Sequence, residues 1–146
     1  MREIVGKPAG AGLRIAIVVA RFNRSVTESL LDGALECLRD YGVADDAIDV
    51  LRVPGAFEIT VAAEHCAASG RYAALICLGA VVRGETPHFE FISREVSRGV
   101  NDVACRHRIP VAFGVLTTDN MEQALARAGE GHGNKGYEAA ITALEM

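Results

Sequence analysis

The segment from Gly84 to His88 combines residue types that bind anions and transfer protons. Gly84 and Glu85 lead into Thr86 and Pro87, and proline is favoured at the first helical position, so we expect a helix with Thr86 as its N-cap. The free backbone N–H groups at such a helix start can bind a phosphate or a carboxylate. An ordinary capped helix start would use the same residues and is equally favoured by the sequence.

His88 falls in the first turn of this predicted helix. The positive end of the helix dipole disfavours an imidazolium there, so we expect a neutral ring that can accept a proton at pH 7. A lone histidine more often packs or caps, but the position beside a predicted anion site slightly favours a proton carrier. The other histidines, His65, His107 and His132, lack such neighbours and are expected to be structural or solvated.

Two further residues that follow predicted strands could contact a ligand. Phe22 stands between Arg21 and Asn23 just after the first strand, and a planar ligand could stack on it. Glu58 lies in the opening turn of a predicted helix, where it offers two acceptor oxygens for ligand hydroxyl groups. A favourable partner for the helix dipole would have the same position.

For four other residues, residue type and position favour a role that involves no ligand. Core packing is favoured for Phe57 and Phe113 because phenylalanine is usually buried. Arg127 falls in the last turn of a predicted helix and Lys135 in a turn, and each is more often a solvated charge than a ligand clamp.

Apolar stretches of strand length alternate with helical patterns along the chain, which is typical of a parallel sheet with helices on both faces. We expect an α/β protein, a flavodoxin-like three-layer α/β/α sandwich with a four-stranded parallel sheet, whose ligand lies beyond the carboxyl ends of the strands. Residues 1–13 should form an N-terminal arm, either reaching a neighbouring subunit or frayed, and residues 14–146 a single domain. The predicted strands span residues 14–20, 48–53, 73–78 and 111–116.

Capping patterns predict three more helix starts. Ser25 and Glu28 make one capping box, and Asp119 and Glu122 make another. The last helix is expected to begin at about Asn134 and to run to the C-terminus.

Composition narrows the classes of function. Fifteen Lys and Arg against nineteen Asp and Glu give a formal charge of -4, so neither nucleic acid nor an anionic membrane is an expected partner. The longest nearly uncharged apolar run, residues 73–82, is shorter than the roughly 18–20 residues that span a bilayer. No signal-peptide pattern is present, and we expect a cytoplasmic protein.

The four cysteines are widely spaced and have no histidine at metal-ligand spacing. They lie in apolar stretches, so buried free thiols are expected, with a catalytic thiol as a remote alternative. No metal site is predicted. The four are Cys37, Cys66, Cys77 and Cys105.

Five segments together resemble the 6,7-dimethyl-8-ribityllumazine synthase family, in the order and with the spacing of that family. The match runs from about Arg14 to Met146, and no single motif discussed above is as specific. The segments are ARFN (residues 20–23), VPGAFE (53–58), GAVVRGETPHF (79–89), GVLTTD (114–119) and GNKGYEAA (133–140).

The resemblance implies the penultimate step of riboflavin biosynthesis. In that step 5-amino-6-ribitylaminouracil condenses with 3,4-dihydroxy-2-butanone 4-phosphate and releases phosphate and water. It implies no cofactor and no metal. The resemblance also implies roles for matched residues. Phe22, beside Asn23, stacks on the pyrimidine, and the backbone of Val81 and Val82 binds that ring. The ribityl chain is held by Ala56, Phe57 and Glu58.

The phosphate and the proton transfers are assigned in the same way. By resemblance, the loop of Gly84, Glu85 and Thr86 holds the phosphate, and His88 is the proton carrier. By the same resemblance, Arg127 of an adjacent subunit also binds the phosphate, and Phe113 comes from that neighbour as well. Lys135 and Glu138 match residues near the same site. The chain lacks the lysine that many relatives carry between Gly129 and Gly133.

Sites shared between subunits imply a homo-oligomer. The common unit of the family is a pentamer, often closed into an icosahedral shell, and relatives that stop at pentamers tend to have an insertion between the last two helices. Only three residues separate Gly129 from Gly133, which favours the 60-subunit shell. The partners implied are small-molecule substrates, other copies of the chain and, as a candidate, riboflavin synthase.

Two other classes of function compete with this interpretation. One is a flavin or lumazine binder, or a shell protein, that keeps the fold without turnover. His88 and Arg127 argue against it, because a pure binder needs neither a proton carrier nor a phosphate clamp. A flavodoxin-like electron carrier is the weaker alternative.

Overall fold

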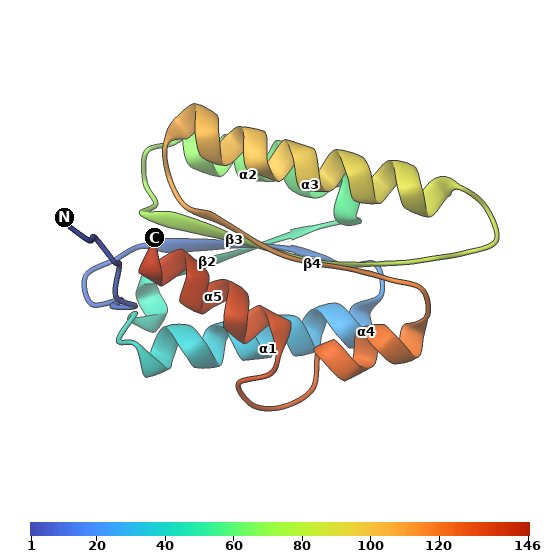
Figure 1. Cartoon of the computed structure of the whole chain (residues 1–146), viewed down its shortest axis with the longest axis horizontal. Helices are drawn as coiled ribbons and strands as arrows, with labels where there is room; N and C mark the ends of the chain where they lie inside the picture. Colours follow the sequence, from blue (N-terminus) through green and yellow to red (C-terminus); the bar gives the residue numbers. More distant parts are fainter.

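Four parallel strands form the middle layer of the computed structural model, which describes all residues from 1 to 146 (Figure 1). Their order across the sheet is β2-β1-β3-β4. β1 is buried along its whole length, as expected for a parallel strand covered on both faces. The strands are β1 (Ile15–Ala20), β2 (Ile48–Val53), β3 (Ala74–Val82) and β4 (Val111–Thr118).

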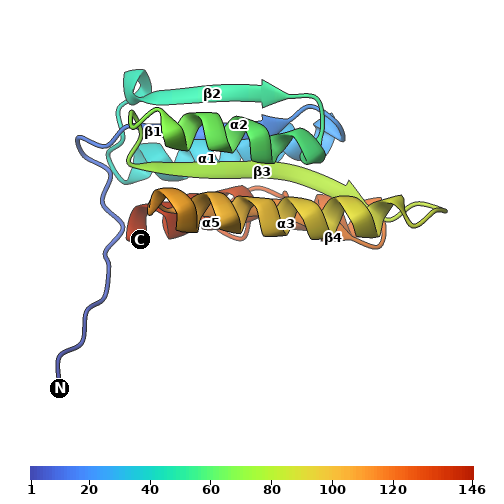
Figure 2. The same cartoon turned by 90° about the horizontal axis from the view of Figure 1, so that it is seen from above.

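Helices cover both faces of the sheet, so the predicted three-layer α/β sandwich is confirmed (Figures 1 and 2). One face carries α1 (Arg24–Asp40), α4 (Met121–Arg127) and α5 (Lys135–Glu145), and the other carries α2 (Ile59–Ala68) and α3 (His88–His107). Two short 3-10 helices, η1 (Asp45–Ala47) and η2 (Ala56–Glu58), precede β2 and α2. No helix is both long and apolar enough for a membrane span.

Each face of the sheet has its own hydrophobic core. The α1/α4/α5 side holds 23 buried residues and the α2/α3 side holds 16. Alternate residues of β1 enter opposite cores, with Ile17 on the first side and Val18 on the second. Because successive side chains of β1 point to opposite faces, this one strand packs against the helices on both sides of the sheet.

β3 and β4 extend further than their apolar runs predict. β3 ends at Val82 and not at Leu78, and β4 ends at Thr118 and not at Leu116. The two strands remain paired up to Val82 and Thr118, whereas β1 pairs with β3 only as far as Leu78. β-Branched residues fit an extended ladder, so the strands continue past the point where β1 stops.

Three predicted helix caps are wrong by one or two residues. α1 begins at Arg24 after Asn23, and Glu28 forms an ion pair with Arg52 of β2 where a capping box with Ser25 was expected. The N-cap of α3 is Pro87, not Thr86.

At α4 the capping pair is also displaced. Asn120 accepts a hydrogen bond from the Gln123 N–H, and the Gln123 side chain accepts one from the Asp119 N–H, both at 2.9 Å. A reciprocal pair therefore exists, but one residue later than the Asp119 and Glu122 pair.

The start of α5 at Asn134 is confirmed. The buried Asn134 side chain accepts from the Gly136 and Tyr137 N–H groups and donates to the carbonyl oxygens of Ser29 and Gly129. A Cβ atom at Gly33 of α1 would lie 2.3 Å from the Asn134 Oδ1 atom. The glycine therefore leaves the space that this amide needs.

The N-terminal segment lies outside the sandwich. Residues 1–9 contain no helix or strand, and the segment runs away from the rest of the chain (Figure 2). Ile4 and Val5 are exposed. Gly6 already lies against the end of α5, where a Cβ atom would collide with the backbone of Glu145. Further along, the Gly10 N–H donates to the Tyr41 carbonyl at 2.8 Å.

The cysteine prediction is wrong at one of four positions. Cys105 is exposed, whereas Cys37, Cys66 and Cys77 are buried. Burial raises the pKa of Cys37 and of Cys77 to about 12, which leaves these two thiols protonated and unreactive at neutral pH.

The packing of α5 on α1 generates a stability prediction. A Cβ atom at Gly136 would lie 1.9 Å from the backbone oxygen of Leu30, so Gly136→Ala must push the two helices apart. We expect a loss of about 1–3 kcal/mol in the free energy of unfolding, measured by denaturant titration. Gly133→Ala is the matched control, since its φ is not positive and a Cβ atom there would have no neighbour within 4 Å. Equal stability of the two variants would contradict the prediction.

Candidate active site

A cleft of about 840 Å³ opens beyond the carboxyl ends of β1, β2 and β3, where a parallel sheet is expected to bind its ligand. It brings together ten of the residues singled out from the sequence. They are Phe22, Asn23, Ala56, Phe57, Glu58, Val81, Val82, Gly84, Thr86 and His88. Glu85 is exposed beside the cleft but does not line it, and Phe113, Arg127 and Lys135 line a different cavity.

Phenylalanines are unusually exposed around this cleft. Phe22 is 69% exposed, Phe57 60% and Phe91 62%. The expectation that Phe57 packs in the core is therefore wrong, as it is for Phe113, which is 43% exposed. Exposed aromatic rings that line one cavity are typical of a binding surface for a planar ligand or for another protein.

Asn23 holds the rim of the cleft in place. Its backbone is left-handed (φ 60°), which turns the chain from β1 into α1, and its Nδ2 atom donates to the Ala80 carbonyl oxygen at 2.8 Å. This bond joins the end of β1 to β3 at a point where the two strands are no longer paired. The Asn23 amide therefore positions the neighbouring Phe22.

The free edge of β3 contributes backbone groups to the cleft. Ala80 directs its carbonyl toward β1, where Asn23 binds it, and Arg83 directs its N–H toward β4, where it bonds to the Thr118 carbonyl at 2.8 Å. Both backbone groups of one strand residue point to the same edge, and those of the next residue point to the opposite edge. The N–H and C=O groups of Val82 therefore point to the side that β1 leaves open, and those of Val81 point to β4.

The Glu58 carboxylate is half-buried and has no ion pair or hydrogen bond within the chain. It belongs to η2, and a Cβ atom at Gly55 would lie only 3.2 Å from its Oε2 atom. The side chain therefore folds back over Gly55. Its acceptor oxygens remain available to hydroxyl groups in the cleft.

The loop before α3 presents a group of unpaired donors. No backbone or side-chain acceptor binds the N–H groups of Gly84, Glu85, Thr86, His88 or Phe89. They adjoin the start of a 20-residue helix, whose dipole adds positive potential. The His88 side chain is exposed, lines the cleft and makes no hydrogen bond with the chain. This arrangement can bind an anion beside an imidazole.

Sequence reasoning missed Arg83. Its Nε atom donates to Asp119 at 3.0 Å, its Nη1 atom donates to Glu90 at 3.4 Å, and its guanidinium lies 4.5 Å from the centre of the Phe89 ring. The hydrogen bond to Asp119 is the main cause that raises the pKa of Arg83 above its ordinary value. Asp119 is 36 positions away in sequence, so no local pattern signals the contact.

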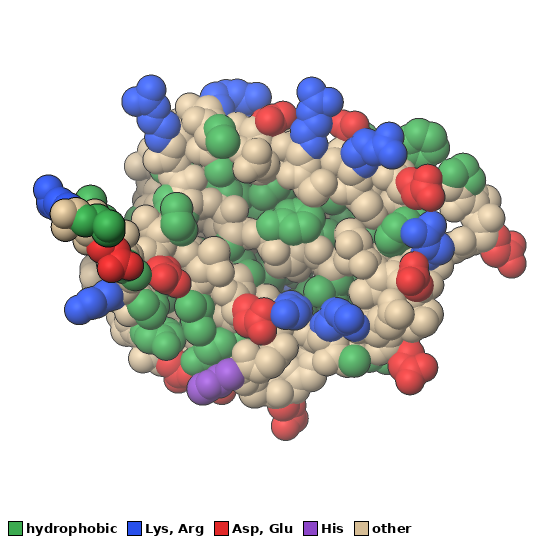
Figure 3. All heavy atoms as spheres, in the orientation of Figure 1, with side chains coloured by type: hydrophobic (Ala, Val, Ile, Leu, Met, Phe, Trp, Pro, Cys, Tyr) green, Lys and Arg blue, Asp and Glu red, His purple; other side chains and the backbone are tan.

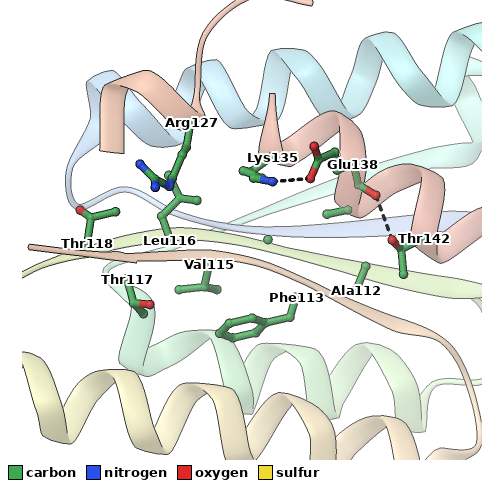
Figure 4. A pocket seen from close by; sticks show the side chains of 12 residues that line it. Ala112, Phe113, Val115, Leu116, Thr117, Thr118, Arg127, Lys135, Glu138 and Thr142 are labelled. Carbon is green, nitrogen blue, oxygen red and sulfur yellow. Dashed lines mark hydrogen bonds and ion pairs between the residues drawn. The ribbon is translucent and has the colours of Figure 1, made fainter. Parts of the chain in front are cut away.

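A second cavity, of about 500 Å³, straddles the free edge of β4 (Figure 4). Figure 4 shows Arg127, Lys135 and Glu138 on one side of the strand and Phe113 on the other. Seen from the same direction as Figure 1, this face carries exposed hydrophobic side chains with neighbouring positive and negative groups (Figure 3). The cavity shares no lining residue with the cleft.

The charges of the second cavity are only partly neutralised. Lys135 Nζ lies 2.6 Å from the Glu138 carboxylate. Arg127 Nη1 donates to the Gln123 carbonyl at 3.0 Å, and its side chain has no acidic partner. Arg127 is therefore a free cation at an exposed edge.

No residue that lines either cavity belongs to a metal-ligating cluster. The group with suitable spacing is Glu36, Asp40 and His132, all exposed, with ligand atoms within 4.8 Å of one another. These side chains line neither the cleft nor the cavity at β4.

The protein is an α/β sandwich with a cleft at the carboxyl end of its parallel sheet. The cleft combines aromatic rings and a free carboxylate with unpaired backbone amides and an imidazole. The family model of 6,7-dimethyl-8-ribityllumazine synthase matches residues 12–146, and the chain belongs to this family. It is thus an enzyme, a transferase of riboflavin biosynthesis.

The hydrogen bond of Asn23 generates a prediction about the rim. Asn23→Gly removes the bond to Ala80 and should cost about 1 kcal/mol of unfolding free energy. Asn23→Ala loses the same bond but, unlike the glycine variant, keeps a Cβ atom in the left-handed region, so it should be less stable than Asn23→Gly by about 1–2 kcal/mol. Arg108→Gly is the control, because Arg108 has a similar φ of 55° and no comparable bond, and it should not lower stability. Thermal and urea unfolding of the three variants give the comparison, and an alanine variant as stable as the glycine variant would refute it.

Proposed function

We propose that the protein condenses 5-amino-6-(D-ribitylamino)uracil with 3,4-dihydroxy-2-butanone 4-phosphate to give 6,7-dimethyl-8-ribityllumazine, phosphate and water. The observation that carries this proposal is the meeting, in one cleft, of the exposed Phe22 ring, the unpartnered Glu58 carboxylate, the unpaired amides of the 84–89 segment and His88. Membership of the family supports it. We assign the reaction to the cytoplasm and to the penultimate step of riboflavin formation.

The pyrimidine substrate fits the β1 and β3 side of the cleft. Its ring stacks on Phe22, which Asn23 positions, and its polar edge meets the free backbone groups of Val82, with the Val81 side chain beneath. The ribityl chain extends over Ala56 and Phe57, and its hydroxyl groups donate to the Glu58 carboxylate.

The phosphate of the ketone substrate binds at the start of α3. The N–H groups of Gly84, Glu85 and Thr86 have no partners within the chain, so a phosphate can bind them without breaking any hydrogen bond of the protein. The helix dipole stabilises the same negative charge. The leaving group is therefore held before and after the bond to it breaks.

His88 carries protons between intermediates. Imine formation, phosphate loss and ring closure each move protons, but none needs a strong nucleophile from the protein. An imidazole that lines the cleft and is free of other hydrogen bonds can accept and return these protons. Much of the rate then comes from holding two reactants together.

The active site is completed by a neighbouring subunit. Phe113, Arg127 and Lys135 lie in the cavity at β4, apart from the cleft, so a single chain cannot place them on its own substrate. An adjacent copy would bring its β4 edge to the cleft, with Phe113 beside the pyrimidine, and Arg127 and Lys135 on polar groups of the substrates. We propose pentamers closed into a 60-subunit shell, with the 1–13 arm reaching a neighbour and riboflavin synthase as a candidate partner of the shell.

Turnover tests the activity directly. The wild-type protein mixed with both substrates should form fluorescent lumazine and release one phosphate for each product. His88→Ala should lower kcat by about 100-fold without abolishing it, because proximity remains. His65→Ala, an exposed histidine of α2 outside the cleft, is the control and should keep full activity. Ligand binding by the wild-type protein without product would favour the non-catalytic binder instead.

Mixed oligomers test the shared site. Chains with His88→Ala and chains with Arg127→Met, unfolded and reassembled together, should show more activity than either variant alone, because some clefts with His88 then face a neighbour with Arg127. A mixture of His88→Ala chains and Glu58→Gln chains should show no such gain. Both residues line the same cleft, so every cleft in this mixture lacks one of them. Equal activity of the two mixtures would contradict a site built from two subunits. Light scattering of the wild-type protein gives the mass of the assembly, and a pentamer mass would exclude the shell.

A further inference from the structure

Arg83 joins three elements around the anion-binding segment. Its backbone N–H donates to Thr118 at the end of β4, and its guanidinium bonds to Asp119 in the turn before α4 and to Glu90 in the first turn of α3. Its Cζ atom lies over the Phe89 ring, 4.5 Å from the ring centre. One side chain therefore fixes the end of β3 relative to the start of α3.

The charges around this segment oppose the binding of a phosphate. Three carboxylates, those of Glu85, Glu90 and Asp119, lie in or next to it, all on exposed residues. A phosphate dianion would be repelled by each carboxylate that remains uncompensated. The Arg83 guanidinium pairs with both Glu90 and Asp119 and offsets one of their two negative charges.

Two donors of Arg83 bind these carboxylates, and its guanidinium lies over the Phe89 ring. Arg83 also does not line the cleft, unlike its neighbours Val82 and Gly84. Arg83 is therefore placed to act on a phosphate indirectly. Exposed ion pairs of this kind contribute little to folding, so we expect the loss of Arg83 to change the free energy of unfolding by less than about 1 kcal/mol.

We propose that Arg83 is a positioning residue for the phosphorylated substrate: it masks Glu90 and Asp119 and orients the 84–89 amides, so that the segment accepts a dianion. The assignment of the phosphate to a ketone substrate rests on the proposed function; the electrostatic role of Arg83 does not. It predicts a defect confined to the phosphate-bearing ligand, and one that is reversed when the unmasked carboxylates are removed.

The first experiment measures the binding of inorganic phosphate by calorimetry at low ionic strength. Arg83→Met should weaken phosphate binding roughly tenfold, because it removes the one positive charge that pairs with two nearby carboxylates. The triple variant Arg83→Met, Glu90→Gln, Asp119→Asn should return to within about threefold of wild type. Arg39→Met is the matched control, because Arg39 forms a comparable exposed pair with Asp45, at 2.8 Å, outside both cavities.

A second measurement separates positioning from a general loss of structure. In the lumazine assay, Arg83→Met should raise KM for the butanone phosphate and leave KM for the pyrimidine within about twofold. The proposal is overturned if both KM values rise together, if phosphate affinity is unchanged in Arg83→Met, or if the triple variant stays as weak as the single one. Failure of the wild-type protein to form lumazine would refute the proposed function, while the phosphate titrations would still decide the role of Arg83.

Discussion

The unequal length of two strand ladders is the constraint on which the cleft depends. β3 pairs with β4 as far as Val82, but it pairs with β1 only as far as Leu78. The last residues of β3 are thus held on one edge and bare on the other. The Asn23 amide binds the Ala80 carbonyl on this bare edge, and the next outward-facing backbone groups, those of Val82, are left for a ligand. A longer β1 would satisfy these groups and close the site.

The proposed site is incomplete in a single chain. Its cleft has exposed phenylalanine rings, and the cationic side chain of Arg127, which we propose completes the site, lies at a different edge of the sheet. The free edge of β4 adds to this exposure, since an unpaired strand offers backbone donors and acceptors to another chain. Assembly and catalysis would therefore draw on the same surfaces. The two arginines also differ in their partners: Arg83 pairs with acidic groups of the chain, whereas Arg127 has no acidic partner within it.

The sequence predicted the fold well because strand and helix periods differ and because Gly and Pro mark the ends of elements. It also predicted most of the cleft, since residues that follow parallel strands meet at one edge. Helix caps were less predictable: Ser25 is a good cap by type, but the left-handed turn at Asn23 starts α1 earlier. Residue type alone favoured the core for Phe57 and Phe113, and this was wrong because residue type predicts burial only on average. Arg83 could not be found, because its partner Asp119 is distant in sequence.

The amide of Asn134 has a consequence for how this protein can change. It bonds to two carbonyl oxygens, of Ser29 on α1 and Gly129 after α4, and caps α5 with two more bonds. Both ends of the connection between α4 and α5 are thereby anchored, and the residues between them, Glu130 to His132, are exposed. Extra residues inserted there would form an outward loop without moving Lys135. The connection is a natural point at which evolution, or a designer who wishes to display a peptide, can lengthen the chain while the β4 edge stays unchanged.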